Sequence, residues 1–416
     1  MPRPALSGLL ESDYAKSRRV YLYRPAREFE VFIQINLDIV IAVKLLSPRN
    51  ALICLVSVAL LALYLAVWLT FARSSVAKQS DFIIYYSAGT VPLSKLYNVE
   101  AQREIQTGVL GSTFPVKGGV MPFNHTPVFV PLLHLLVDDD YAASYLRWTS
   151  LLWVAVFVCA FMIFRMTGDV AFALAAASFY PLFTYVQQAH DTVFLLLGIL
   201  LGAHLLSLRK DFLAGIALSL TTLKPQFAIF LAVPLVIRPK AFFGFCAASA
   251  LLAIYSVLLV GSQGVADFLT LLRINAQGEV FGVRPLEMFN LLGLMERAGV
   301  SSHFARPIAW AIFVLASISL FFIWKRQPSN PPFALTILLA VFTSPHLLGH
   351  DLALLLVCFT TVAKPTALFL LGSSLAFVTL SIFFASKWQF AFAYLLMGAL
   401  LAMAIRDIRQ PGRAAS

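Results

Sequence analysis

The chain alternates long apolar runs with short polar turns, a pattern typical of proteins built from membrane-spanning helices. Residues 51–71 form the clearest run, because about 20 apolar residues are needed to cross the hydrocarbon core of a bilayer. Counting this run, the pattern predicts an all-α polytopic membrane protein with about twelve transmembrane helices. The predicted segments lie at approximately 51–71, 143–165, 169–187, 190–208, 211–223, 225–238, 241–261, 306–325, 331–345, 348–363, 366–384 and 389–405.

Two polar stretches interrupt the apolar runs and predict long loops. Residues 72–142 mix charged side chains with prolines and glycines, which predicts a first non-cytoplasmic loop carrying short helices. Within it, the apolar run from Val128 to Val137 is too short to cross a bilayer, so we expect it to dip in and return. A second non-cytoplasmic loop is predicted at residues 262–305.

The N-terminal fifty residues are rich in arginine and lysine, which predicts a cytoplasmic segment at residues 1–50. Their charge leaves no apolar core for a cleavable signal peptide. From Ile33 to Ile39 apolar and polar residues alternate, and this pattern leaves an interfacial helix and a local strand equally open. The predicted membrane domain is then residues 51–410, followed by a cytoplasmic tail at residues 411–416.

Composition supports the membrane interpretation and excludes other classes. Of 416 residues, 60% are hydrophobic and only 12% are charged, about half the charged share of ordinary soluble domains. The net charge of +11 is explained by basic cytoplasmic loops rather than by nucleic-acid binding. The four cysteines lie singly inside apolar runs, so the sequence predicts no disulfide framework and no zinc site.

The basic clusters fall on alternate turns between the apolar segments, which puts both termini in the cytoplasm. These clusters are Arg165, Arg209 with Lys210, Arg238 with Lys240, Lys325 with Arg326, Lys364, and Arg406 with Arg409. The opposite turns carry Asp81, Gln188, Lys224 and His346. Such a one-sided concentration of polar groups favours chemistry at the outer interface, since a transport path would spread them through the depth of the membrane.

Asp81 is the leading candidate for a catalytic group. It directly precedes an apolar helix that begins at Phe82, and a carboxylate at a membrane boundary is a functional-site candidate by default. It could serve as the general base that removes a proton from a hydroxyl acceptor. The alternative is a structural helix cap. The adjacent Tyr85 and Tyr86 favour function, because they offer a surface for stacking and hydrogen bonding to substrate.

Lys224 stands between two apolar segments that are each too short for an ordinary span. Pro225 breaks what would otherwise be a continuous helix there. A broken helix pair exposes backbone dipoles and a lysine to an anion, which favours a phosphate-binding role. The alternative is a lysine that only anchors the chain at the interface.

Two further outer turns carry candidate substrate-binding residues. The spacing of His346 and His350 predicts two rings on one helical face beside Asp351, which would suit a metal, but no third ligand is evident nearby. Hydrogen bonding to substrate or phosphate is therefore preferred, with helix capping as the alternative, and no metal or cofactor is predicted. His125 is expected to join this cluster.

In the other turn, Gln188, His190 and Asp191 are equally consistent with sugar recognition and with helix capping.

The order of these motifs resembles the GT-C glycosyltransferases, and more narrowly glycosyltransferase family 87, the polyprenyl-phosphate-mannose-dependent mannosyltransferases. The resemblance rests on Asp81 with Tyr85, Tyr86 and Leu96-Tyr97, on Thr126-Pro127, Gln187-Gln188, Gly215 to Lys224-Pro225 and Arg238, and on Ser344-Pro345-His346 to Asp351. It implies a GT-C-like fold and an inverting sugar transfer with Asp81 as base and no need for nucleotide or metal. The chain lacks the usual Gly-Gln at the amide turn and the usual double proline near residue 126.

The resemblance also implies partners and a location. These are a polyprenyl-phosphate sugar donor, a glycolipid or glycan acceptor, and the lipid bilayer of a bacterial inner membrane, with the active site facing the periplasm. The sequence has no P-loop, GxGxxG motif or serine-nucleophile motif in a suitable context, which argues against a nucleotide-driven enzyme. Two rival functions stay open: a flippase or transporter of lipid-linked sugars, and a non-catalytic partner in envelope assembly.

Overall fold

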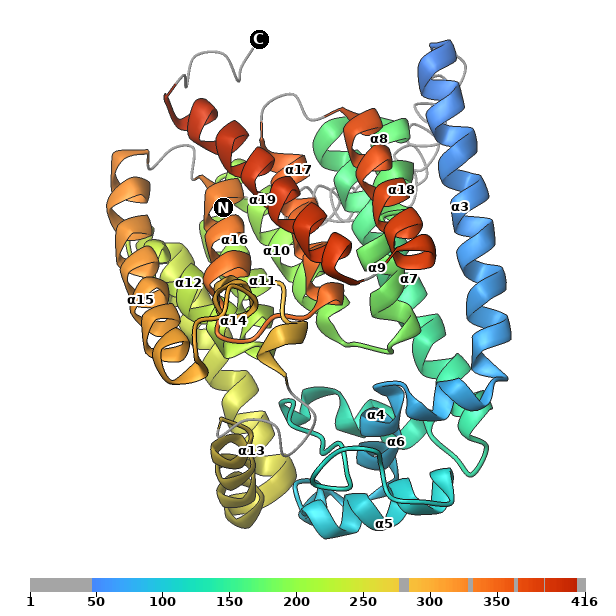
Figure 1. Cartoon of the computed structure of the whole chain (residues 1–416). Helices are drawn as coiled ribbons and strands as arrows, with labels where there is room; N and C mark the ends of the chain where they lie inside the picture. Colours follow the sequence, from blue (N-terminus) through green and yellow to red (C-terminus); the bar gives the residue numbers. More distant parts are fainter. Residues whose placement is uncertain (1–46, 277–283, 328–331, 363–365, 385, 410–416) are drawn as a thin grey trace, which may run out of the picture. The chain divides into compact units, whose positions relative to one another are not determined.

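A computed structural model describes residues 47–276, 284–327, 332–362, 366–384 and 386–409, and these residues contain helices and loops but no strand (Figure 1). The predicted all-α class is therefore confirmed for the described chain. Most of the predicted cytoplasmic segment, including Ile33–Ile39, and the tail 411–416 lie outside the described residues. The chain divides into two compact units, residues 1–52 and 53–416, and the second unit is described below by itself.

The helices and their bounds are α3 (Pro48–Ala72), η1 (Ser75–Gln79), α4 (Phe82–Thr90), η2 (Leu93–Lys95), α5 (Val99–Leu110), η3 (Pro127–Phe129), α6 (Val130–Leu136), α7 (Tyr141–Thr167), α8 (Val170–Ala177), α9 (Tyr180–Gln187), α10 (Thr192–Ser207), α11 (Asp211–Leu218), η4 (Ser219–Leu223), α12 (Pro225–Leu235), α13 (Pro239–Ala276), η5 (Pro285–Glu287), α14 (Leu291–Arg297), α15 (Ser302–Arg326), α16 (Phe333–Thr343), η6 (Gly349–Leu354), α17 (Leu355–Thr361), α18 (Ala367–Phe383) and α19 (Ser386–Arg409).

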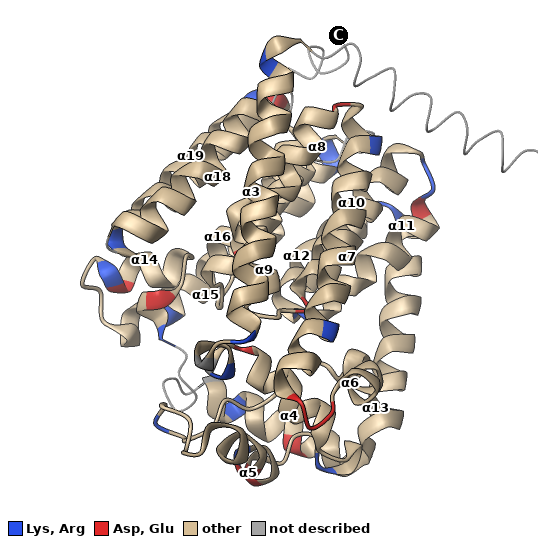
Figure 2. Cartoon of the chain, turned by 90° about the vertical axis from the view of Figure 1, so that its right-hand side faces the viewer, with Lys and Arg blue, Asp and Glu red and all other residues tan. Residues whose placement is uncertain are grey.

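Five described helices are long and apolar enough to cross a membrane: α3, α7, α13, α15 and α19. A sixth span is possible if α8 and α9, which are bent by 42° at a short break, count as one. The expected count of about twelve is thus not confirmed, because the other predicted segments form shorter helices, such as α12, whose 11 residues begin at Pro225. Figure 2 shows charged residues mainly toward the helix ends, as expected for a membrane protein.

The predicted first loop folds into the short helices α4, α5 and α6, which gather at one end of the second unit (Figure 1). The apolar run from Val128 becomes η3 and α6, too short to span and packed against α4, α7 and the second half of α13. Two buried glutamines of α5 fix the segment that leads to His125. Gln102 Oε1 accepts from the Phe123 amide at 2.6 Å, and Gln106 Oε1 accepts from the Met121 amide at 3.0 Å.

The start of the predicted second loop is helical, because residues 262–276 continue helix α13. The helix bends at Gly261, whose φ of 70° lies in the left-handed region that glycine adopts without strain. Beyond the bend, Phe268 contacts Tyr97 with ring centroids 4.8 Å apart. This contact packs part of the helix against the first loop, whereas Leu269 and Leu272 are exposed. The remainder of the predicted loop contains η5 and α14.

We expect Gly215→Ala to destabilise the protein, because α11 and α13 cross there with their backbones in close contact. A Cβ added at Gly215 would lie 1.9 Å from the Ala241 carbonyl oxygen, so the helices would have to separate. Overpacking of this kind costs about 1–3 kcal/mol. Gly398→Ala in α19 is the matched control, since a Cβ there meets nothing within 4 Å. Thermal unfolding in detergent should show a lower Tm for the first variant alone, and equal Tm values would contradict this packing.

Candidate active site

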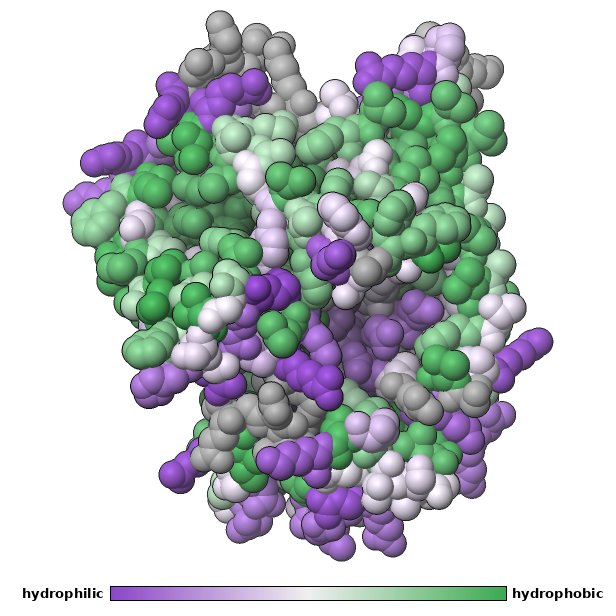
Figure 3. Space-filling view, in the orientation of Figure 1, coloured by the Kyte–Doolittle hydropathy of each residue, from purple (hydrophilic) through white to green (hydrophobic). Residues whose placement is uncertain are grey.

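A central cavity of about 260 Å³ lies where α4, the α9–α10 turn, the start of α12 and the segment before η6 meet. Its charged or titratable lining residues are Asp81, His125, His190, Lys224, His346 and His350. Six predicted residues from different parts of the sequence are thereby brought to one place. In Figure 3, hydrophilic residues gather in a recess beside α4–α6, whereas the surface of the helices above it is largely hydrophobic.

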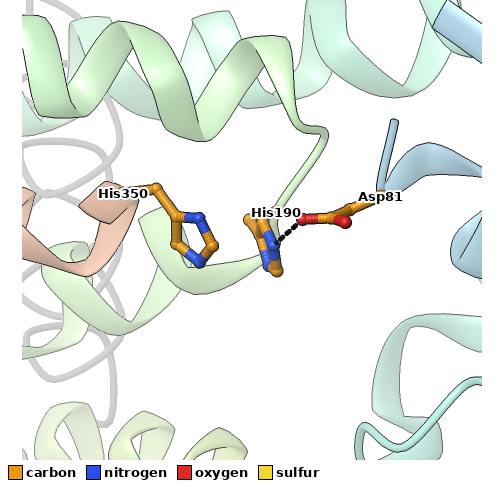
Figure 4. A group of neighbouring side chains, drawn as sticks. All are labelled: Asp81, His190 and His350. Atoms are coloured by element: carbon orange, nitrogen blue, oxygen red, sulfur yellow. Dashed lines mark hydrogen bonds and ion pairs between the residues drawn. The ribbon is translucent and has the colours of Figure 1, made fainter. Parts of the chain in front are cut away.

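Asp81 lies at the N-terminus of α4 but does not cap it, because its side chain makes no hydrogen bond to the first turn. Instead, Asp81 Oδ2 lies 2.8 Å from Nε2 of His190 (Figure 4). Burial opposes ionisation of Asp81, but the His190 hydrogen bond and the nearby His350 and His125 rings outweigh it and lower its pKa below the ordinary value. The side chain keeps 23% of its surface exposed. Asp81 is therefore an accessible carboxylate held in its ionised form, as a general base requires.

The turn between α9 and α10 aims His190 at Asp81. Helix α9 ends in a Schellman motif, in which the His190 amide donates to the Tyr185 carbonyl and the Ala189 amide donates to the Val186 carbonyl. Ala189 occupies the left-handed position with φ of 63°, where glycine is usual. The indole Nε1 of Trp148 donates to the Ala189 carbonyl at 2.8 Å and secures the turn. The unusual alanine is thus held by its surroundings.

Asp191 follows His190 and is buried beside His125 and Tyr85. Its Oδ1 accepts from the Tyr85 hydroxyl at 3.1 Å and lies 3.3 Å from His125 Nδ1. Burial raises the cost of its charge, yet the neighbouring His125, His190 and Lys224 lower its pKa to about 2. Asp191 is not among the residues that line the cavity, and its predicted contact with substrate stays a prediction.

Lys224 sits in the break between η4 and α12, as its sequence context predicts. Its backbone is extended, with φ of −127° and ψ of 94°, the conformation that a following proline favours. The ammonium group pairs with Asp351 and lines the cavity. Asp351 is fully buried, and its Oδ2 also accepts from the Leu348 amide at 3.1 Å. Asp351 is thus the counter-ion of Lys224, and its predicted contact with substrate stays a prediction.

His346 and His350 both line the cavity but do not share a helical face, so this prediction is wrong. His346 lies in the bend after α16, and His350 lies in η6, because Pro345 and the extended residues before Gly349 interrupt the helix. Burial, aided by the charge of Lys224, lowers the pKa of His346 to about 4, which leaves it neutral at pH 7. The ring of His350 stacks near that of His190, with centroids 3.8 Å apart (Figure 4).

Tyr85 and Tyr86 do not form the predicted stacking surface. Tyr85 is 1% exposed and Tyr86 is 7% exposed, and neither lines the central cavity. The Tyr85 ring stacks on Trp148 instead, and the Tyr86 hydroxyl donates to the Asp138 carbonyl. These contacts attach α4 to α7 and to the segment after α6.

Gln188 lies beside Asp81 and also lines a second cavity. Its Oε1 is 3.4 Å from the Asp81 amide nitrogen, a long hydrogen bond. The second cavity, about 380 Å³, is lined by further amide and hydroxyl groups from Thr184, Ser381 and Gln389; we refer to it as the amide cavity. His350 lines both this cavity and the central one. The two spaces thus meet at His350, with Gln188 beside Asp81.

Sequence reasoning missed several residues that shape the site. Trp148 and Tyr185 lie inside predicted helices, and nothing in the pattern shows that their polar atoms reach the α9–α10 turn and Asp351. Asn275 lines the central cavity from the end of α13, in a segment predicted as loop. A third cavity, about 430 Å³ and mainly apolar, shares Leu272, Asn275 and His346 with the central one. We refer to it as the apolar cavity.

Among the residues that the structure describes, two groups of three side chains come close enough to hold a metal ion. In each group, one ligand atom per residue lies within 4.8 Å of the others: Asp81, His190 and His350 in one, and His125, His190 and Asp191 in the other. The sequence suggested His346 and His350, but only His350 belongs to one of these groups, because residues distant along the chain supply the other ligands. These clusters share His190.

Comparison with known proteins gives one family. A model of glycosyltransferase family 87 matches residues 122–348, more than half of the 416-residue chain. The match includes His125, His190, Lys224 and His346 but not Asp81, whose place in the site comes from its contacts alone. No curated protein and no solved structure gives a significant match.

Proposed function

The chain belongs to glycosyltransferase family 87, and we propose that it moves a sugar, mannose or another hexose or pentose, from a polyprenyl-phosphate donor to a glycolipid or envelope glycan. Membership in the family makes it a glycosyltransferase, and its apolar helices indicate a membrane protein. The observation that supports a catalytic site most directly is the ionised, accessible Asp81 beside the cationic Lys224 in one cavity.

In this proposal Asp81 acts as the general base. The acceptor hydroxyl gives its proton to the Asp81 carboxylate while its oxygen forms a bond to the anomeric carbon of the donor sugar. The bond from that carbon to the phosphate oxygen breaks, and polyprenyl phosphate leaves with the electron pair. Attack opposite the leaving group inverts the anomeric centre. His190 supports this step because its hydrogen bond orients the Asp81 carboxylate.

The donor phosphate is proposed to bind at Lys224, since charge on the departing phosphate needs a cation. The polyprenyl chain would extend into the apolar cavity, whose lining includes Leu272, Leu292 and Trp310. The amide cavity suits the neutral glycan of the acceptor, because amides and hydroxyls bind sugar hydroxyl groups and aromatic rings such as Tyr180 cover sugar faces. His346 and His350 stand where these spaces join the central cavity.

Product formation tests the proposal. Purified protein supplied with a polyprenyl-phosphate sugar and a glycolipid extract should release polyprenyl phosphate and glycosylate the acceptor. A flippase or transporter of lipid-linked sugars, the alternative function, would move the donor across a vesicle membrane without consuming it. Intact donor with measurable translocation would overturn the enzymatic proposal. Mass spectrometry of envelope glycolipids from a deletion strain would identify the acceptor.

We further propose a bacterial inner-membrane topology with about twelve membrane segments and the site facing the periplasm. In a variant without native cysteines, an impermeant thiol reagent applied to whole cells should label cysteine at Lys117, an exposed position in the loop of Asp81. It should not label cysteine at the exposed Lys210 or Lys325, which are expected in the cytoplasm. Permeabilised cells should label at all positions. Outside labelling at Lys210 but not at Lys117 would overturn this topology.

A further inference from the structure

Carboxylates and histidines surround the central cavity. Lys224 is the only lysine or arginine among the described residues that line the cavity, and it is already paired with Asp351. Asp81 pairs with His190, and the buried Asp191 pairs with His125. A divalent cation held among these histidines and carboxylates would attract the phosphate that the proposed donor carries.

One buried histidine nitrogen is free to bind such an ion. His190 is 7% exposed, and its Nδ1 has no hydrogen-bond partner among the described residues. The other nitrogen, Nε2, faces Asp81 Oδ2 at 2.8 Å. In the neutral ring that donates its proton from Nε2 to this carboxylate, Nδ1 keeps a lone pair. A buried polar atom without a partner is costly unless something binds it. A histidine whose other N–H donates to a carboxylate is the usual arrangement of a metal ligand.

Two further ligand atoms converge on this histidine. His125, His190 and Asp191 each place one ligand atom within 4.8 Å of the other two, and His125 Nδ1 lies 3.3 Å from Asp191 Oδ1. The His125 and His190 rings are 6.0 Å apart at their centroids and inclined by 49°. Such inclined rings can direct two in-plane lone pairs at one ion. Two imidazoles and one carboxylate are the protein ligands of many catalytic zinc sites, which keep a position open for substrate.

We propose that His125, His190 and Asp191 bind one divalent transition-metal ion of the Zn²⁺ class, with an open coordination position toward the central cavity. Asp81 supports the site by accepting the Nε2–H of His190, and Tyr85 orients Asp191 through its hydroxyl. The role of this ion, which rests on the proposed function, is to bind the donor phosphate opposite Lys224 and to stabilise the charge of the leaving group. This departs from the metal-free mechanism that the family resemblance implies.

The alternative ligand set of Asp81, His190 and His350 is less suitable. The rings of His190 and His350 lie 3.8 Å apart at an angle of only 31°. Nearly stacked imidazoles direct their in-plane lone pairs along similar lines rather than at one point. Binding through this set would also occupy the carboxylate that serves as base. The set with His125 leaves Asp81 available for proton transfer.

Metal binding to the whole protein, freed of its purification tag and stripped with chelator, tests the proposal without substrate. Titration with Zn²⁺, and with Co²⁺ followed by its visible absorption, should give one ion per chain. His190→Gln, His125→Gln and Asp191→Asn should each weaken binding by about a hundredfold or more, and Asp81→Asn by about 10–100-fold because a neutral amide replaces the charged carboxylate that accepts the His190 hydrogen bond. His303→Gln, at an exposed histidine of α15, is the matched control and should bind normally.

Three results would overturn the proposal. One is no stoichiometric binding of Zn²⁺ or Co²⁺ to the intact protein. Another is unchanged affinity in both His125→Gln and Asp191→Asn, variants that remove ligands from different elements. The third is strong loss in His350→Gln with none in His125→Gln, which would assign the ion to the other set. Metal binding is measured without donor or acceptor, so its absence would leave the proposed sugar transfer intact. Full sugar transfer by the metal-free protein would show that the reaction does not need the ion.

Discussion

Replacing Asp81 with asparagine should lower the turnover of sugar transfer by about 10²–10⁴-fold, the usual contribution of a general base. Asparagine preserves the shape of the side chain and can still accept the His190 hydrogen bond, but it cannot take the acceptor proton. Stability should change little, because Asp81 makes no capping bond to α4. The measurement is the rate of polyprenyl-phosphate release at saturating donor, with thermal stability and donor binding measured on the same preparation.

Asp169→Asn is a matched control, since Asp169 is a true helix cap whose side chain accepts from the Phe172 amide at 3.1 Å. Asparagine and aspartate cap comparably, so this variant should keep full activity. Assays with and without added Zn²⁺ separate loss of the base from weakened metal binding. Asp81→Glu should also be impaired, because moving the carboxylate by about 1 Å can cost ~10²-fold. A stable, active Asp81→Asn enzyme would end the catalytic assignment.

The positions of Asp81, Lys224 and His346 illustrate what the sequence could predict. Each of these residues lies at the end of an apolar run, on a turn that the basic clusters assign to the outer side of the membrane. This assignment alone predicts that the three residues lie at the same end of the helices. The structure brings all three to one cavity. The break at Lys224 was also predictable, because a proline directly after it prevents the helix from continuing.

The contacts inside the site could not be predicted in the same way. The direction of His190 depends on a left-handed alanine held by Trp148, and alanine gives no local signal for that conformation. The pairing of Lys224 with Asp351 joins residues 127 positions apart, and no periodicity encodes it. Tyr85 looked available to substrate because a strongly apolar helix does not reveal which of its faces other helices will cover. Burial is a property of the assembled fold.

The number of membrane segments stayed ambiguous for a related physical reason. An apolar run shows that a segment avoids water, but it does not show whether one straight helix or two short ones occupy it. Pro225 and the break between α8 and α9 convert expected spans into shorter pieces. Irregular backbone at membrane depth is tolerated where protein or a polar cavity surrounds it. Lys224 lies at such a break and lines the central cavity, so the loss of regular helix coincides with the candidate site.

Replacing Lys224 with alanine should weaken use of the donor by about ten- to hundredfold, since a charge-assisted hydrogen bond contributes about 1.5–3 kcal/mol. Lys224→Arg should keep part of the affinity, because it preserves the charge. The effect should appear in the KM for the donor and in direct binding of polyprenyl phosphate more than in the KM for the acceptor. Unchanged donor affinity in Lys224→Ala would reassign Lys224 to anchoring at the interface.

The pairing with Asp351 requires one more variant. Lys224→Ala leaves a fully buried carboxylate without its cation, and such a loss destabilises a protein by about 3–5 kcal/mol. Adding Asp351→Asn removes that unpaired charge, so the double variant should regain thermal stability. If Lys224 binds the phosphate, the double variant stays weak in donor use despite its restored stability. If Lys224 only neutralises Asp351, donor use and stability recover together, because the structural defect is then the whole effect.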